Sequence, residues 1–364
     1  MAIFKLNFIG DVMLGRLIDQ LFPVHVSCPS EAAIISSIRS RVSTSPHLES
    51  FSLTTPWGNS LPLLSSADLN LINLETSATT HDVKWPNKVF NYRMHPTNIA
   101  ALKTADIHYA GLANNHTLDF SRQGLLDTVH TVRTAGIAYA GAGTTREEAL
   151  APAVLKLPAT GGGEHEVHVY AASDHPDDWG SVEEFHLIDY STGTRQRLKD
   201  MLTTRPRPSL KVFSVHWGPN YAWKPAKEIR DLAHFLVDEC GVDVVHGHSS
   251  HHVQGVEVRN GSLVIYGCGD FVDDYAVVEG GWRNDLSAVW QVRVREEEGE
   301  NMRLVPERLE VFPNRIQEFQ AHLLEREDKD HEWVVGKVKD LSRNLGTRSK
   351  DELGEKGQLV VSLL

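Results

Sequence analysis

The sequence has few cysteines and no long apolar segment. Only three of its 364 residues are cysteine, and they lie far apart, at Cys28, Cys240 and Cys268. This spacing excludes a disulfide framework and a paired-cysteine zinc site, and it favours a reducing compartment. The first residues, MAIFKLNFIGDV, show no cationic region leading into an apolar segment with a cleavage site, and no apolar run reaches membrane-spanning length. We therefore expect a cytoplasmic protein without an export signal or a membrane span.

An excess of positive charge is also lacking, since the formal net charge is −12. Such a charge repels the phosphate backbone that supplies most non-specific nucleic-acid affinity, which argues against a DNA or RNA partner. A single cleft can still be locally basic, so a small anionic substrate stays open. Apolar residues make up 41% and charged residues 23%, which is typical of a folded globular protein.

Apolar segments alternate with helical patterns through the first two-thirds of the chain. The segments from His95, Ser121 and Lys224 space apolar residues three and four apart and predict helices, two of which end near Gly136 and Gly241. Several apolar segments are hydrophobic on both faces, as in a covered sheet. The segments that predict strands are residues 3–9, 69–74, 107–113, 137–140, 166–172, 210–215 and 242–245. Because parallel neighbours need helical crossovers, we expect an α/β fold with a largely parallel sheet.

The pattern changes after His252. Two apolar runs flank Asn260-Gly261, whose residue types favour the positive φ angles of a hairpin turn. Residues 286–312 predict a second hairpin with an acidic tip. We expect one main domain over residues 1–312, followed by a helical extension, residues 313–364, that ends in a short strand.

Polar residues directly follow five of the predicted strands. Ligands of parallel α/β sheets bind beyond the carboxyl ends of the strands, so these residues are expected to converge. They are, strand by strand, Asp11; Asn73 and Glu75; Asn114, Asn115, His116 and Asp119; His216; and His246, His248, His251 and His252. Carboxylates, amide oxygens and imidazoles hold zinc, manganese or iron in hydrolytic sites, and two such ions can activate water and neutralise a leaving oxygen. We predict one or two divalent ions at this edge.

Each residue also has a purely structural interpretation. Asp11 could cap a helix that begins near Val12, because aspartate is a preferred N-cap. Asn114 and Asn115 could be turn formers. His216 alone is more often a hydrogen-bonded core residue than a ligand. Only the whole set favours a site.

The histidine cluster DVVHGHSSHH has its own geometry. Alternation along a strand places His246 and His248 on the same side, and a turn at residues 249–250 swings His251 or His252 back toward the same point. We expect at least one of the four to be an exposed loop histidine.

Other catalytic signatures are weak or missing. The segment GAGTTR, residues 141–146, lacks the third glycine of a dinucleotide fingerprint and predicts a tight turn. The chain has neither a P-loop nor a Gly-x-Ser-x-Gly nucleophile elbow. Water activated by metal is therefore the expected nucleophile.

The ordered motifs GDVMLGR, NLE, GLANNHTLDF, HWG and GHSSHHVQG, with LVIYGCGDFVDDY after them, resemble the CapA family of poly-γ-glutamate capsule-synthesis proteins, relatives of calcineurin-like metallophosphoesterases. The similarity covers roughly residues 2–311. It implies an α/β sandwich of two mixed β-sheets flanked by helices, with a metal site at the strand ends. It also implies that His116 is the acid toward the leaving group, and that the metal ligands are Asp11, Asn115, His216, His248 and His251.

Two departures from the phosphoesterase pattern bear on the metal site. Met13 stands where those enzymes usually have a histidine ligand, and its thioether is a poor ligand for a hard hydrolytic metal. Glu75 replaces the usual bridging aspartate, and its longer side chain can bind metal or act as a base on water. The sequence does not separate these two roles for Glu75.

Three cations are candidates for holding the substrate. Arg16 lies one helical turn past Asp11, and Lys88 and Arg93 lie in the loop NKVFNYRMHP. All three could bind a carboxylate or a phosphate, or could be solvated loop residues. The residues expected to orient the ligands are Asn73, Asn114, Asp119, His246, Asp270 and Asp274.

These observations favour a metal-dependent hydrolase that acts on an anionic substrate, with a γ-glutamyl amide as the expected bond. A phosphoesterase is the alternative enzyme, because metals that polarise an amide carbonyl also polarise a phosphoryl oxygen. A non-catalytic component of polymer or capsule synthesis is the third hypothesis, which Met13 keeps open. The oligomeric state is not predicted.

Overall fold

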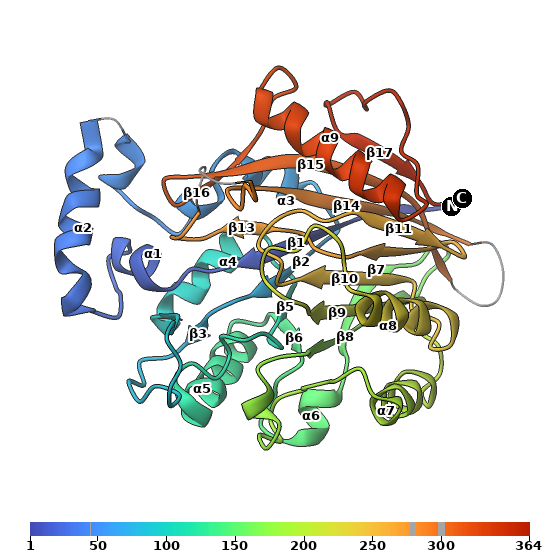
Figure 1. Cartoon of the computed structure of the whole chain (residues 1–364), viewed down its shortest axis with the longest axis horizontal. Helices are drawn as coiled ribbons and strands as arrows, with labels where there is room; N and C mark the ends of the chain where they lie inside the picture. Colours follow the sequence, from blue (N-terminus) through green and yellow to red (C-terminus); the bar gives the residue numbers. More distant parts are fainter. Residues whose placement is uncertain (44, 277–280, 298–302) are drawn as a thin grey trace.

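Two mixed β-sheets pack face to face in the computed structural model, which describes residues 1–43, 45–276, 281–297 and 303–364 (Figure 1). The first sheet runs in the order β16 (Gln320–Leu323), β15 (Leu304–Gln317), β14 (Leu286–Glu296), β1 (Ile3–Val12), β2 (Leu69–Leu74), β5 (Tyr109–Gly111) and β6 (Ala138–Ala140). In addition, β13 (Asp270–Val272) pairs with β1, and β17 (Leu359–Ser362) pairs with β15. The second sheet runs β11 (Val256–Arg259), β12 (Ser262–Ile265), β10 (Val244–His248), β9 (Leu210–His216), β8 (Glu164–Ser173) and β7 (Ala153–Pro158).

Each sheet combines a run of parallel strands with antiparallel strands. The strands β13, β1, β2, β5 and β6 are parallel, whereas β14, β15, β16 and β17 are joined by antiparallel pairing. In the second sheet β12, β10, β9 and β8 are parallel, and β11 and β7 are antiparallel edges. A short separate pair joins β3 (Ser77–Ala78) to β4 (Arg93–Met94). The predicted sandwich of two mixed sheets is confirmed.

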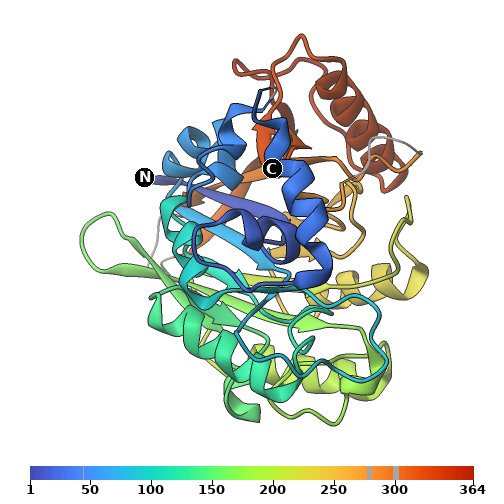
Figure 2. The same ribbon diagram turned by 90° about the vertical axis from the view of Figure 1, so that its left-hand side faces the viewer.

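Helices lie on the outside of the sandwich. The helix α9 contacts β15 and β14, on the opposite side of the molecule from α6 and α7 (Figures 1 and 2). The α-helices are α1 (Arg16–Leu21), α2 (Ala32–Arg39), α3 (Leu61–Ser65), α4 (Ala100–Thr104), α5 (Ser121–Thr134), α6 (Arg146–Leu150), α7 (Thr192–Thr203), α8 (Lys227–Asp238) and α9 (Lys329–Asn344). Short 3-10 helices are η1 (Pro29–Glu31), η2 (Ser40–Ser43), η3 (Pro46–Leu48), η4 (Thr55–Ser60), η5 (Pro96–Ile99) and η6 (Asp177–Trp179). No helix in the described ranges is both long and apolar enough to cross a bilayer.

The predicted strands and helices are present, with one correction at the first motif. Strand β1 continues to Val12, so Asp11 lies inside the strand, and the first helix begins only at Arg16. Asp11 therefore does not cap a helix at Val12. The reason is pairing, because β13 lies alongside the end of β1 and extends it.

Hairpins follow the parallel strands, as expected. Asn260 and Gly261 have φ angles of 51° and 79° and connect the antiparallel strands β11 and β12. The strands β14 and β15 form the second hairpin, whose acidic tip includes residues 298–302, which lie outside the described residues.

The C-terminal segment continues the first sheet. Strand β15 crosses the boundary expected at residue 312, and β17 returns to pair with β15 after a single long helix, α9. The segment after residue 312 thus begins as a strand rather than as a helix. Its buried Val334 and Val338 belong to the same apolar core as Leu6 and Phe8 of β1.

Candidate metal centre

The carboxyl ends of four parallel strands bring distant residues together. In the first sheet, the register places Asp11 of β1 beside Asn73 of β2, and Asp11 also lies beside Asp270 of β13. In the second sheet, His216 of β9 lies beside His248 of β10. Because the two sheets pack against each other, these ends meet in the interior.

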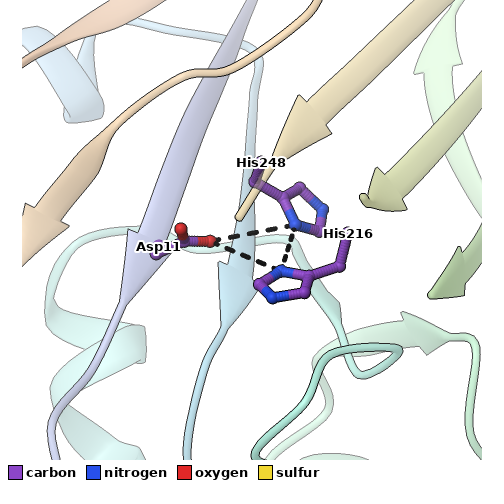
Figure 3. Close-up of side chains that lie close together, drawn as sticks. All are labelled: Asp11, His216 and His248. Carbon is purple, nitrogen blue, oxygen red and sulfur yellow. Dashed lines mark hydrogen bonds and ion pairs between the residues drawn. The ribbon is translucent and has the colours of Figure 1, made fainter. Parts of the chain in front are cut away.

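The first group of ligand atoms comprises Asp11, His216 and His248 (Figure 3). Asp11 Oδ1 lies 3.9 Å from His216 Nδ1 and 3.8 Å from His248 Nδ1. The two Nδ1 atoms are 2.9 Å apart. All three side chains are buried, so their nitrogen and oxygen atoms face one another without access to bulk water.

The second group comprises Asp11, Glu75, His251 and Asp270. His251 Nδ1 lies 3.0 Å from Asp270 Oδ1. His251 adopts a φ of 62° directly after the turn, a left-handed conformation that is uncommon outside glycine and asparagine. Asp11 belongs to both groups, so one carboxylate lies between two sets of ligand atoms.

The buried carboxyl groups of the site lack a compensating positive charge among the described residues. Burial raises the pKa of Asp11, and it raises the pKa of Glu75 and Asp270 well above their ordinary values, with further contributions from the neighbouring carboxylates. Burial likewise holds the pKa of His216 and His248 well below the ordinary value, so both imidazoles are neutral. No lysine or arginine among the described residues forms an ion pair with Asp11, Glu75 or Asp270.

Several buried oxygens at the site have no hydrogen-bond partner among the described residues. They are Glu75 Oε1, Asp270 Oδ2 and Asn115 Oδ1. Unpaired buried acceptors are costly, and a cation would satisfy them. Neutral imidazoles, carboxylates and an amide oxygen form a donor set that suits zinc, manganese or iron. The residues therefore fit one or two divalent ions.

Met13 does not contribute to either group. Its side chain is fully buried, and its sulfur accepts a hydrogen bond from the Gly15 backbone N–H at 3.2 Å. Met13 therefore contributes to packing and not to the ligand set. Glu75, in the next motif, lies in the second group of ligand atoms.

His116 lies at the Glu75 end of the site. Its Nε2 is 3.7 Å from Glu75 Oε1, and its Nδ1 is 2.6 Å from Asp119 Oδ2. Lys88 forms an ion pair with Asp119, and Tyr92 stacks on the His116 ring with centroids 3.8 Å apart. Burial lowers the pKa of His116 to about 4, so the ring is neutral near pH 7.

Four of the residues predicted to orient ligands, Asn73, Asn114, His246 and Asp270, contact the ligands or their partners, and Asp270 belongs to the second ligand group itself. Asn73 Nδ2 donates to Asp11 Oδ1 at 2.7 Å, and Asn114 Nδ2 donates to Asn73 Oδ1 at 3.1 Å. His246 and His248 share Ser214, as strand alternation predicts, with each ring 3.1 Å from Ser214 Oγ.

The expectation of an exposed histidine in the cluster is wrong. His246 and His252 are fully buried, and His248 and His251 are 1% and 7% exposed. The polar turn after β10 lies beneath the aromatic side chains of Trp223 and Trp282, which pack on His252 with centroids 4.3 and 5.1 Å away.

The three candidate substrate cations do not lie together. Lys88 reaches the site through Asp119 and His116. Arg16 pairs with Asp274 at 3.3 Å and lies over the Tyr92 ring. Arg16 and Arg93 instead line a separate cleft of about 260 Å³, where Arg93 also packs over Phe120. Asp274 thus orients Arg16 rather than a ligand.

Sequence reasoning missed the Asp174-His175 pair. The His175 ring lies beside His216, with centroids 5.1 Å apart, and its Nδ1 pairs with Asp174. These residues directly follow β8, so the rule that identified the other strand ends would have found them too. The rule of polar residues after a strand did not indicate Tyr92 and Tyr275, the tyrosines beside the site.

The fold and the site define a two-sheet α/β protein with a buried acid and histidine cluster at its strand ends. The chain belongs to the bacterial capsule synthesis protein PGA_cap family, whose sequence model matches residues 5–275. A probable polyglutamine synthesis accessory protein of Mycobacterium tuberculosis is 33% identical over 360 residues, which covers 93% of this chain and 91% of the relative. The capsule biosynthesis protein CapA of Bacillus anthracis is 26% identical over 242 residues, or 65% of this chain and 56% of that protein. Among solved structures, a hypothetical protein from Thermus thermophilus matches with a TM-score of 0.44 and 13% identity, over 85% of this chain and 98% of that one.

Proposed function

We propose that this chain is a metal-dependent hydrolase that acts on an anionic substrate, and that the bond it cleaves is a γ-glutamyl amide. The observation that carries the proposal is the position of Asp11, which belongs to two buried groups of ligand atoms whose carboxylates have no lysine or arginine partner in the part of the chain that the structure describes. One or two divalent ions, zinc, manganese or iron, would be held by Asp11, Glu75, Asn115, His216, His248, His251 and Asp270. A bound ion supplies positive charge that polarises the scissile bond and makes water a better nucleophile.

His116 is the residue that moves the proton. Because Asp119 accepts from Nδ1–H, the neutral ring presents an unprotonated Nε2 toward Glu75. Nε2 takes a proton as water attacks and returns it to the leaving nitrogen, so that hydrolysis yields a carboxylate and an amine. Lys88 holds Asp119 in place, and Tyr92 fixes the plane of the ring.

The substrate class follows from the family and from the nearby cations. Relatives carry names that refer to polyglutamine and capsule synthesis, which supports a polymer of glutamyl units as the source of the substrate. Arg16 and Lys88 lie within one or two side chains of His116 and would hold its carboxylates. The three cysteines are free, which supports a reducing, cytosolic location.

Two assays on one preparation test the proposal. The chain is stripped with a chelator, reloaded separately with Zn²⁺, Mn²⁺ and Fe²⁺, and assayed on γ-glutamyl amides and on phosphomonoesters. We expect amide hydrolysis that disappears on chelation and returns with metal. Turnover of phosphomonoesters alone would favour the phosphoesterase. Metal binding without turnover of either class would favour a non-catalytic role in polymer synthesis, in keeping with the accessory function named for a relative.

A further inference from the structure

Three histidines stand in a row along the carboxyl edge of the second sheet. The register places Ser173 of β8 beside His216, and His216 beside His248. His175 follows β8 two residues after Ser173 and continues the row. Its ring centroid is 5.1 Å from that of His216, the same separation as between His216 and His248. His175 therefore flanks the first ligand group without belonging to it.

Asp174 fixes the orientation and the tautomer of His175. Asp174 Oδ1 pairs with His175 Nδ1, and its Oδ2 accepts from the Tyr190 hydroxyl at 2.5 Å and from the Gly218 N–H at 2.8 Å. Burial alone would raise the pKa of Asp174, but these hydrogen bonds hold it below its ordinary value. A carboxylate that accepts from Nδ1–H leaves Nε2 as the acceptor of the ring. This Nε2 has no hydrogen bond to any residue that the structure describes.

His175 faces an open cleft, unlike the buried histidines beside it. Its side chain is 28% exposed, whereas that of His216 is 1% exposed. The cleft has a volume of about 580 Å³, and Asn115 lines it together with His175. Asp177 and Glu228 also line it, and no lysine or arginine of the described ranges does. The negative charge here contrasts with the cation Lys88, which lies beside His116.

We propose that this cleft binds the amine half of the substrate and that His175 Nε2 accepts a hydrogen bond from the N–H of the scissile amide. An amide nitrogen carries a hydrogen that an acceptor can bind, whereas the bridging oxygen of an ester or phosphoester carries none. The released amine becomes an ammonium near neutral pH, which Asp177 and Glu228 favour electrostatically, so the amine half that fits this cleft is one without a carboxylate of its own. The substrate thus lies with its anionic acyl half toward Lys88 and its amine half toward His175. This inference rests on the proposed function and selects an amide as the bond.

The test compares an amide with its ester. Wild-type chain and His175→Ala, both loaded with metal, are assayed on γ-glutamyl anilide and on the phenyl ester with the same acyl group. We expect His175→Ala to lower kcat/KM for the anilide at least about 10-fold, the effect of one hydrogen bond, and to leave the ester nearly unchanged. Metal content and thermal stability are expected to be unchanged. His234→Ala is the matched control, because the His234–Glu257 pair has nearly the same exposure, 26% and 9%, as the 28% and 10% of His175–Asp174.

Asp174→Asn tests the role of Asp174 as a positioning residue. An asparagine amide donates to Nδ1 and places the proton on Nε2, which then repels the amide N–H. We expect the same fall in the anilide-to-ester ratio as for His175→Ala. A purely structural role would lower both rates together and leave the ratio intact.

Calorimetric binding of the uncleaved anilide distinguishes a failure of the proposed hydrolysis from a failure of the proposed His175 subsite. If wild type binds the anilide without cleaving it and His175→Ala weakens binding about 10-fold, hydrolysis is wrong and the subsite stands. If His175→Ala binds or cleaves the anilide as well as wild type does, or loses anilide and ester equally, the subsite is wrong. If the wild type neither binds nor cleaves the anilide, both the proposed hydrolysis and the proposed subsite are wrong.

Discussion

The Nδ1 atoms of His216 and His248 lie 2.9 Å apart on adjacent parallel strands, and each is within 3.9 Å of Asp11 Oδ1. Two neutral imidazoles that face each other through the same type of atom can share one proton or one cation. Ser214 satisfies the other nitrogen of His248, which leaves Nδ1 directed at His216 and Asp11. Substitution of these residues therefore tests directly whether they bind metal.

The shared position of Asp11 predicts an unequal effect of ligand substitutions. Asp11→Asn is expected to weaken metal binding in both groups by at least about 100-fold, because both lose a carboxylate. His248→Ala is expected to affect only the first group and His251→Ala only the second. The metal-to-protein ratio after equilibration with Zn²⁺ or Mn²⁺, measured by mass spectrometry of the metals, checks this. Asp238→Asn, at a surface carboxylate paired with Arg259, is the control. Full metal content in Asp11→Asn would contradict the shared role.

The raised carboxyl pKa values predict how pH affects the metal-free chain. Glu75 and Asp270 have pKa values well above the ordinary range, and that of the adjacent Asp273 is raised to about 7, because burial disfavours their charged forms. At these carboxyl groups the folded chain binds more protons than the unfolded chain, so their contribution to the free energy of unfolding falls as the pH rises above about 4. The buried histidines, whose pKa values are lowered, act in the opposite sense below about pH 6.5. We therefore expect the net loss, roughly 1 kcal/mol or more, between pH 7 and pH 8, the equivalent of about one pKa unit at one carboxyl.

Urea unfolding at pH 5, pH 7 and pH 8, with chelator and with metal, measures this loss. Metal is expected to stabilise the chain more at pH 8 than at pH 5, because protons compete with it for the carboxylates. The comparison isolates the site, since Asp243, whose pKa is raised to about 6 by burial elsewhere, contributes equally with and without metal. Equal stabilisation by metal at pH 5 and pH 8 would be inconsistent with these ligands.

His116 is expected to act on turnover without holding the metal. His116→Ala should lower kcat by about 10²- to 10⁴-fold, the usual contribution of a proton-transferring side chain. Metal content should stay at the wild-type value, because His116 belongs to neither ligand group. The control is His130→Ala, at an exposed position of α5. Loss of metal in His116→Ala would assign this residue to the ligands instead.

The continuity of β15 predicts that the chain does not fold when it ends at residue 312. The cut divides β15 and removes many buried side chains, among them Val334, Val338, Leu359 and Val361. Each contributes roughly 1.5–3 kcal/mol, so together they approach the whole stability of a typical domain, about 5–15 kcal/mol. Thermal unfolding followed by circular dichroism should show no cooperative transition. Removal of the exposed Leu364 alone is the control, and a cooperative transition in the shortened chain would support a separate extension.

The sequence by itself determined the strands, the hairpins and the chemical types at the strand ends. Apolar runs such as residues 69–74 are local signals, and the rule that ligands lie beyond parallel strands needs no knowledge of strand order. For the same reason it would have found His175, which follows the fifth predicted strand.

Only the tertiary structure decided which of these residues meet. Asp11 became common to two ligand groups because β13, more than 250 residues later, pairs alongside β1. The structure places Arg93 in a separate cleft and buries all four cluster histidines. The packing of loops and aromatic side chains that causes this depends on the whole chain. The pKa shifts followed from that burial. Register, burial and long-range pairing have no local signature, so they could not be predicted from residue spacing.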